Sequence, residues 1–205
     1  MIGAARAVDL VSTAVHARNT TGDNRRVGED QALSDSQQQL VSWLSSHVQI
    51  HRSREGAPSW CYCCVEELVL SVGYWGIPSA LPSRYRRGPE GACYANAAAY
   101  GSAYQLAYVE GYALTRFGLV CEHAWCVDEH GHVHDPTWQD GDGTAYLGVP
   151  FAASYLDRFD RRFRSARPLL DFHLDDYRIL RDGLPRGAVP PIGQPNVTSG
   201  SPTST

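Results

Sequence analysis

Residues 122–138, EHAWCVDEHGHVHDPTW, bring together many side chains that could do chemistry. Four histidines, two aspartates, two glutamates and one cysteine fall within seventeen positions. Such a set could hold a metal ion, supply the base and the carboxylate of a catalytic site, or form a polar turn without chemistry. These three hypotheses make different demands on the rest of the chain.

The metal hypothesis rests on His130, His132 and His134, which alternate along the chain. On a strand they would share one face, and H-x-H is a genuine ligand spacing. A structural zinc site needs four ligands and a catalytic one three plus water, whereas Asp135 would point to the opposite face. We therefore expect His130 in a turn and the other two histidines on an exposed strand face. A metal-binding protein using this cluster remains an alternative.

The catalytic hypothesis requires a cysteine that can be activated, a base, and a group that orients the base. Cys93 follows a Gly-Pro-Glu-Gly turn and begins an alanine-rich, helical stretch. Unpaired amides and the helix dipole there would lower the pKa of its thiol. A hairpin turning at residues 129–131 would bring His123 close to Asp135. Each residue alone has an ordinary structural explanation, but their order and their elements together favour a catalytic triad.

The same residues carry a resemblance to a known family. Helix-start Cys93, the His-Ala-Trp of residues 123–125 and the Asp-Pro-Thr of residues 135–137 resemble the transglutaminase-like, papain-related superfamily of cysteine proteases and acyltransferases. The resemblance covers about residues 85–148. It implies that Cys93 is the nucleophile, His123 the general base and acid, and Asp135 the orienting carboxylate. Because the superfamily contains peptidases, transglutaminases, acyltransferases and inactive members, an inactive binding module is a second alternative to an acyl-transfer enzyme.

The remainder of the predicted site consists of oxyanion donors and pocket residues. The amide of Cys93 would supply one oxyanion donor, and Tyr85 or Trp75 a second. Glu110 lies between two tyrosines on one face of a predicted strand, which favours a place in the pocket over a solvated position. Trp125 shares the face of the catalytic histidine and could shield it from water, or belong to the core.

Periodicity and turn residues predict one α+β domain, with a helical N-terminal half packed on a small antiparallel sheet. Residues 1–33 are expected to be a flexible arm, 34–183 a transglutaminase-like catalytic domain, and 184–205 a disordered tail rich in Pro, Gly, Ser and Thr. The expected helices cover residues 34–48, 59–72, a stretch starting after Gly91, and 149–164. The expected strands form a meander over residues 107–114, 118–127 and 132–136, and residues 73–91 form a long ordered loop.

Composition excludes several classes of protein. The net charge of −4 comes without a basic stripe, so no nucleic-acid partner is expected, and all eighteen basic residues are arginine. No apolar run is long enough for a membrane span, and the N-terminus does not read as a signal peptide. We expect a cytoplasmic enzyme without a cofactor, acting on a peptide, a protein or a small acyl or amine substrate. The cysteines of the Cys-x-Cys-Cys motif at residues 61–64 are interpreted as reduced core thiols.

Overall fold

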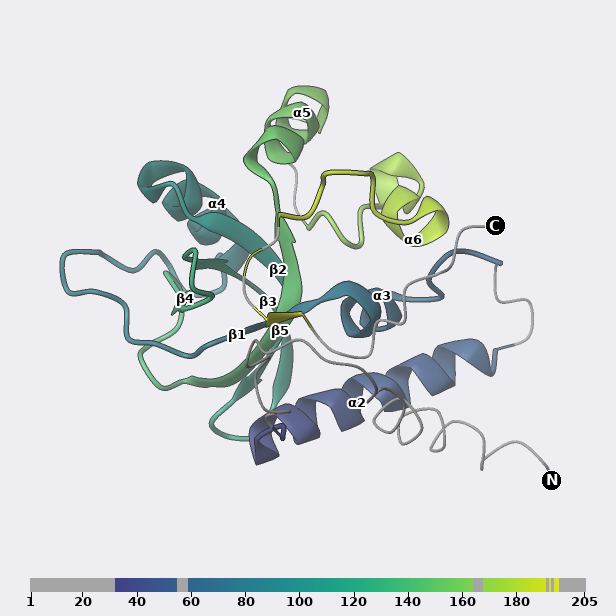
Figure 1. Ribbon diagram of the computed structural model, residues 1–205, viewed down its shortest axis with the longest axis horizontal. Coiled ribbons are helices and arrows are strands. Elements are labelled where there is room, and N and C mark those ends of the chain that lie inside the picture. Colours follow the sequence, from purple (N-terminus) through teal and green to yellow (C-terminus); the bar gives the residue numbers. More distant parts are fainter. Residues whose placement is uncertain (1–31, 55–58, 164–167, 191, 193, 196–205) are drawn as a thin grey trace, which may run out of the picture.

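The computed structural model describes residues 32–54, 59–163, 168–190, 192, 194 and 195, and these residues form an α+β fold (Figure 1). The helices are α2 (Asp35–Arg52), α3 (Val65–Val72), α4 (Cys93–Tyr104), α5 (Ala153–Phe163) and α6 (Arg178–Asp182), with a short 3-10 turn, η1 (His173–Asp175). The strands are β1 (Tyr74–Gly76), β2 (Ala107–Thr115), β3 (Val120–Val127), β4 (Val133–His134), β5 (Gly143–Phe151) and β6 (Gln194–Pro195). Most of the arm predicted for residues 1–33 lies outside the described residues.

The strands form one sheet in the order β4-β3-β2-β5-β1-β6, and all of its ladders are antiparallel. The predicted meander is confirmed for β2, β3 and β4, although β4 is shorter than expected and ends before Pro136. Ile77, directly after β1, exchanges backbone hydrogen bonds with Gly131 and Val133 (2.9 and 2.8 Å). Because β1 and β4 lie toward opposite ends of the strand order, these bonds curl the sheet.

The prediction of a helix from residue 149 is wrong at its start, because Val149, Pro150 and Phe151 belong to β5. This strand lies between β2 and β1 and was not expected. Pro150 is unusual inside a sheet, because proline has no backbone N–H to donate to a neighbouring strand. Its place explains the exception. β1 pairs with β5 only at residues 146–148, so Pro150 lies beyond the end of β1 and needs no donor on that side.

The helices pack on one face of the sheet and enclose the main apolar core. The helix predicted from Ser34 is confirmed as α2, and Ser34 forms a capping box with Gln37. Leu40 and Leu44 on its inner face are fully buried in this core. The helix predicted from residue 59 begins only at residue 65, as α3.

The late start of α3 has a backbone cause. The amides of Cys61 and Tyr62 donate to the carbonyls of Arg181 and Leu180 in α6 (3.1 and 2.9 Å). Cys64 has an extended backbone (φ −162°, ψ 170°) and is the N-cap, so α3 begins only after it.

The other face of the sheet curls on itself around a smaller apolar cluster. Its buried members are Val109, Ala113, Trp125, Val127, Val133 and Tyr146. Glycine in β5 makes room for the indole, since a Cβ on Gly148 would lie 2.7 Å from the Trp125 ring and 2.6 Å from the carbonyl of Glu110.

The chain remains packed beyond residue 184, where the disordered tail was predicted to begin. Ala188 is fully buried, and its carbonyl accepts from the amide of Ala152 (2.8 Å). Further on, β6 pairs with β1. The predicted boundary therefore falls inside the described structure, because apolar residues of this segment pack against the core despite its Pro and Gly content. Residues 196–205 lie outside the described part.

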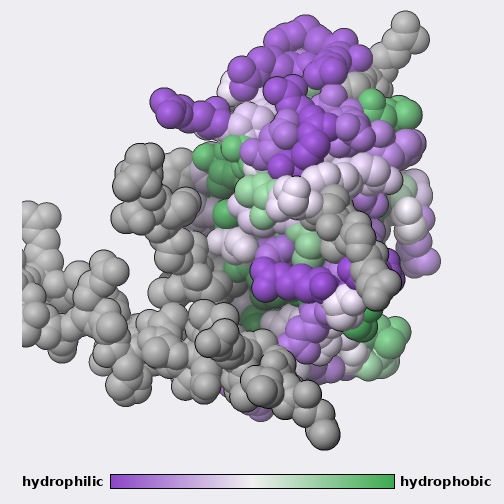
Figure 2. All heavy atoms as spheres, turned by 90° about the vertical axis from the view of Figure 1, so that its right-hand side faces the viewer, coloured by the Kyte–Doolittle hydropathy of each residue, from purple (hydrophilic) through white to green (hydrophobic). Residues whose placement is uncertain are grey.

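The surface that carries α6 is mainly hydrophilic, and apolar side chains show only in patches between polar ones (Figure 2). Within the described ranges, every helix is too short or too polar to cross a membrane.

Candidate active site

The first helical residue of α4 is Cys93, as the sequence predicted. Gly91 adopts a positive φ of 74°, which closes the preceding turn and which side chains other than glycine rarely tolerate. Ala92 is the N-cap and gives no side-chain cap to the helix. The first amides of α4 therefore lack helical partners and point their partial positive charge at the partly buried Cys93.

His123 lies in β3 opposite Gly111 and is 2% exposed. Its Nε2 is 2.8 Å from Oδ2 of Asp135. Since its other partner is the Cys93 thiol, Nδ1 is the nitrogen left to face the sulfur. The indole of Trp138 stacks on the imidazole with ring centroids 4.0 Å apart and planes 16° apart. The structure thus brings together the three residues that the sequence singled out.

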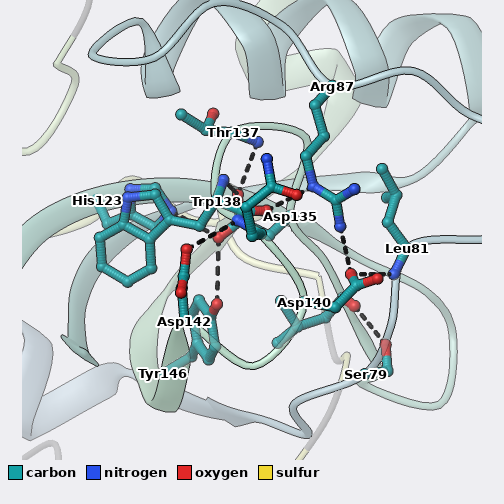
Figure 3. Close-up of polar contacts among 12 residues, drawn as sticks. Ser79, Leu81, Arg87, His123, Asp135, Thr137, Trp138, Asp140, Asp142 and Tyr146 are labelled. Atoms are coloured by element: carbon teal, nitrogen blue, oxygen red, sulfur yellow. Dashed lines mark hydrogen bonds and ion pairs between the residues drawn. The ribbon is translucent and has the colours of Figure 1, made fainter. Parts of the chain in front are cut away.

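The Asp135 carboxylate is held by four hydrogen bonds (Figure 3). Oδ2 pairs with His123 and also accepts from the Tyr146 hydroxyl at 3.1 Å. Oδ1 accepts from the backbone amides of Thr137 and Trp138 at 2.8 and 3.0 Å. Because each oxygen has two partners, the carboxylate has one orientation, and that orientation aims Oδ2 at the imidazole.

The loop predicted over residues 73–91 is tied to the segment that carries the aspartate. Arg87 donates from Nε to the Trp138 carbonyl at 2.6 Å. Asn96, one turn into α4, donates from Nδ2 to the Thr137 hydroxyl at 3.0 Å. These contacts join the cysteine helix, the loop and the aspartate turn into one unit, although the loop also contains β1.

The charges of the site favour a thiolate beside an imidazolium. Burial alone would raise the pKa of the Cys93 thiol, but the hydrogen bond and charge of His123, with backbone hydrogen bonds from Ala124 and Tyr94, bring this pKa below its ordinary value. Burial alone would lower the pKa of His123, but hydrogen bonds to Asp135 and Cys93 and their negative charges raise it. Burial alone would raise the pKa of Asp135, but its hydrogen bond to the imidazole is the main cause that lowers this pKa below its ordinary value.

The other thiols with a resolved shift change in the opposite direction. Burial raises the pKa of Cys63, Cys64 and Cys126, and none of them has a histidine as its main partner. Cys64 makes the closest comparison because it also stands at a helix start, as the N-cap of α3. Its neighbour is the Glu66 carboxylate, which raises the pKa of the thiol further.

The two candidates for a second oxyanion donor, Tyr85 and Trp75, have well-defined surroundings in the described structure. Tyr85 packs on Tyr100 and Tyr104, with ring centroids 5.1 and 4.3 Å away. These residues stand seven and eleven positions beyond Cys93, which is roughly 10 and 16 Å along the helix axis. Trp75 is buried in β1, where its register partners are in β5 and β6.

The other two pocket candidates are built into the core. Glu110 is 1% exposed and accepts hydrogen bonds from the Tyr108 hydroxyl (2.6 Å) and from the amides of Leu169 and Leu170 (2.7 and 3.1 Å). It therefore joins the sheet to the segment that precedes η1. Trp125 is fully buried and packs edge-on against Tyr146, so it is a core residue next to the imidazole.

Of the three histidines in and after the turn, His132 and His134 both approach Oδ2 of Asp128, at 3.1 and 3.9 Å, whereas no ion pair joins His130 to that carboxylate in the part of the chain that the structure describes. The His130 side chain is 70% exposed, whereas His132 bonds through Nδ1 to Asp128 at 3.1 Å and His134 is 15% exposed. The Asp128 carboxylate also caps the turn by accepting from the amides of residues 130 and 132. Among the described residues these imidazoles are not part of a three-ligand cluster.

Three residues of the site were not singled out from the sequence. The position of Trp138 could have been predicted, because it is the last residue of the DPTW stretch and lies three residues after Asp135. The position of Tyr146 could not, because it belongs to the unexpected β5. Asn96 follows Cys93 by three positions in an alanine-rich helix, and only the tertiary structure reveals its partner.

Comparison of the chain with protein-family models, with curated proteins and with solved structures found no match. The assignment of a function to this site therefore depends on its geometry.

Proposed function

We propose that the protein is a cysteine enzyme of the transglutaminase-like type that transfers acyl groups through a thioester on Cys93. The observation that carries the proposal is the arrangement of Cys93, His123 and Asp135. A helix-start thiol contacts an imidazole whose far nitrogen is 2.8 Å from a fully hydrogen-bonded carboxylate. Nucleophile, base and orienting group are the three parts that covalent acyl transfer requires.

In the first half of the reaction, the Cys93 thiolate attacks the substrate carbonyl and forms a carbon–sulfur bond. His123 holds the proton taken from the thiol and donates it to the leaving amine as the carbon–nitrogen bond breaks. In the second half, water or an amine gives a proton to His123 and attacks the thioester, and the thiolate leaves. Asp135 keeps Nε2 protonated throughout, so that Nδ1 carries both proton transfers.

The oxyanion of each tetrahedral intermediate requires hydrogen-bond donors at the start of α4. The amide of Cys93 is suited to this role because the first amides of a helix have no carbonyl partner within it. The same end of the helix carries a partial positive charge, which stabilises both the thiolate and the oxyanion. The free state of all six cysteines supports the further proposal of a cytoplasmic location.

The proposal is tested with two thiol probes on the full chain. Iodoacetamide alkylation, mapped to each cysteine by mass spectrometry, should label Cys93 faster than the more exposed Cys61. p-Nitrophenyl acetate should acetylate Cys93, and hydroxylamine should release the acetyl group as expected for a thioester. Both reactions should be lost in His123→Ala and kept in the control Cys121→Ser. Labelling at Cys93 no faster than at the other thiols, with no effect of His123→Ala, would refute an enzyme and favour an inactive module.

A further inference from the structure

A second group of ligating side chains gathers where the end of α2 meets the start of α3. His51 stands in the last turn of α2, Cys64 is the N-cap of α3, and Glu66 lies in the first turn of α3. One donor atom from each of the three lies within 4.8 Å of the other two. We propose that His51, Cys64 and Glu66 bind a divalent transition-metal ion of the Zn²⁺ class. This site is separate from the triad, and it departs from the expectation that no metal is bound.

The spacing of the donors suits a metal of this size. Bonds of about 2.0–2.3 Å in a tetrahedron place neighbouring ligand atoms roughly 3.3–3.8 Å apart. The observed limit of 4.8 Å exceeds that range by roughly 1 Å, which rotation about the side-chain torsions of His51 and Glu66 can supply. Both side chains are only partly buried and have room to adjust, whereas Cys64 is 5% exposed and fixed in the core.

The donor types select the class of ion. A thiolate, an imidazole and a carboxylate form a ligand set of zinc, whereas magnesium and calcium take oxygen ligands. Three protein ligands leave a fourth position open. Water or another small ligand can fill this position, as in zinc sites with three protein ligands.

The surroundings of the cluster are those of a supported ligand set. The Tyr112 hydroxyl of β2 lies beside the Glu66 carboxylate, and outer partners of this kind hold ligating carboxylates in place. The Cys64 thiol is buried and lies beside this carboxylate. A dication bound here replaces the proton of the thiol, because the thiolate is the form of cysteine that ligates metals. Metal binding must therefore release a proton and strengthen as the pH rises.

Only part of this metal site is visible in the sequence. The Cys-x-Cys-Cys motif was interpreted as core thiols, and that description fits the burial of Cys64. His51 is thirteen positions upstream of Cys64 and in another helix, so its spacing does not link it to the motif. The contact between α2 and α3 brings it to the motif.

The test is titration of the full chain, first treated with a chelator, with Zn²⁺ in competition with a chromophoric chelator, followed by Co²⁺ spectroscopy. The expected result is one Zn²⁺ per chain and a thiolate-to-cobalt charge-transfer band. His51→Ala and Cys64→Ser should each weaken zinc binding by more than about tenfold, the loss seen even for outer-shell partners. The controls His130→Ala, Cys121→Ser and Cys93→Ser should leave zinc binding unchanged.

Two results would overturn the proposal. One is a wild-type chain that binds no zinc or gives no thiolate band with cobalt. The other is binding that survives in His51→Ala but is lost in His130→Ala or Cys93→Ser, which would assign the ion to the exposed histidines or to the triad. His51 is only partly buried, so its variant should fold even if Cys64→Ser does not. Circular dichroism of each variant verifies this.

Discussion

Replacement of Asp135 by asparagine isolates the charge of the carboxylate, because the side chain keeps its shape. The amide oxygen can still accept from the backbone amides of residues 137–138. The amide nitrogen then faces His123 Nε2 and the Tyr146 hydroxyl, where it can donate but not accept. His123 is driven to the tautomer with its proton on Nδ1, and in that form it cannot take the proton of Cys93.

The size of the effect follows from the bond that is lost. A hydrogen bond to a charged group contributes about 1.5–3 kcal/mol, and one pKa unit corresponds to about 1.36 kcal/mol. The side chains of His123 and Asp135 are 2% and 8% exposed, so solvent screens this bond little. Asp135→Asn should therefore lower the pKa of His123 by about one to two units and reduce proton transfer from Cys93 by about 10–100-fold.

The rate of alkylation of Cys93 by iodoacetamide at neutral pH, followed by mass spectrometry of the peptide, measures this change. The rate should fall by the same factor in Asp135→Asn and recover at alkaline pH, where the thiol ionises without help. Asp157→Asn, on the exposed side of α5, removes a carboxylate of the same type far from the triad and should leave the rate unchanged. An unchanged rate in a folded Asp135→Asn variant would refute the coupling of carboxylate, imidazole and thiol.

Three further predictions concern stability and pH. Glu110→Ala should lower the free energy of unfolding by about 2–4 kcal/mol, since a buried hydroxyl and the two amides of residues 169–170 lose their acceptor; chemical denaturation that shows no loss would contradict this. Gly148→Ala should lower it by about 1–3 kcal/mol, because the new methyl group meets Trp125, and an unchanged denaturation midpoint would refute that packing. In the wild type, the rate of Cys93 alkylation should stay high as the pH drops below about 8.5, the pKa of a free thiol. The rate should fall only when the pH drops past the lowered pKa of Cys93. A single transition of the alkylation rate at the pKa of a free thiol would show that Cys93 is not paired with His123.

Local signals were sufficient to predict the elements that carry the nucleophile. Gly91 and the alanine-rich stretch after it predict a helix that starts at Cys93, and α4 begins there. Ser34 and its neighbours predict α2 in the same way. These features depend on a few consecutive residues, so one sequence contains them in full.

The register of the hairpin was predictable from its turn. A hairpin turning at residues 129–131 predicts the pairs that are observed, Cys126 with His134 and Val127 with Val133, and this register sets His123 opposite residue 137, two positions from Asp135. An even offset keeps both side chains on one face, so the imidazole and the carboxylate still meet, diagonally. An odd offset would have separated them.

Features that depend on distant segments could not be predicted. Tyr146 reaches Asp135 only because β5 inserts between β2 and β1, and nothing near Tyr146 in the sequence points to that insertion. The same holds for Glu110, whose backbone partners are about sixty residues away.

Cys64 and Cys93 show why a helix start alone does not identify a nucleophile. Both thiols stand at the N-terminal end of a helix, where the dipole favours a thiolate. The pKa of Cys93 is lowered because an imidazole meets it, whereas the pKa of Cys64 is raised by burial and by the Glu66 carboxylate. The charge of the neighbouring group and the burial of the thiol together outweigh the dipole. The same difference that makes Cys64 a poor nucleophile makes it, with Glu66, a suitable partner for a cation.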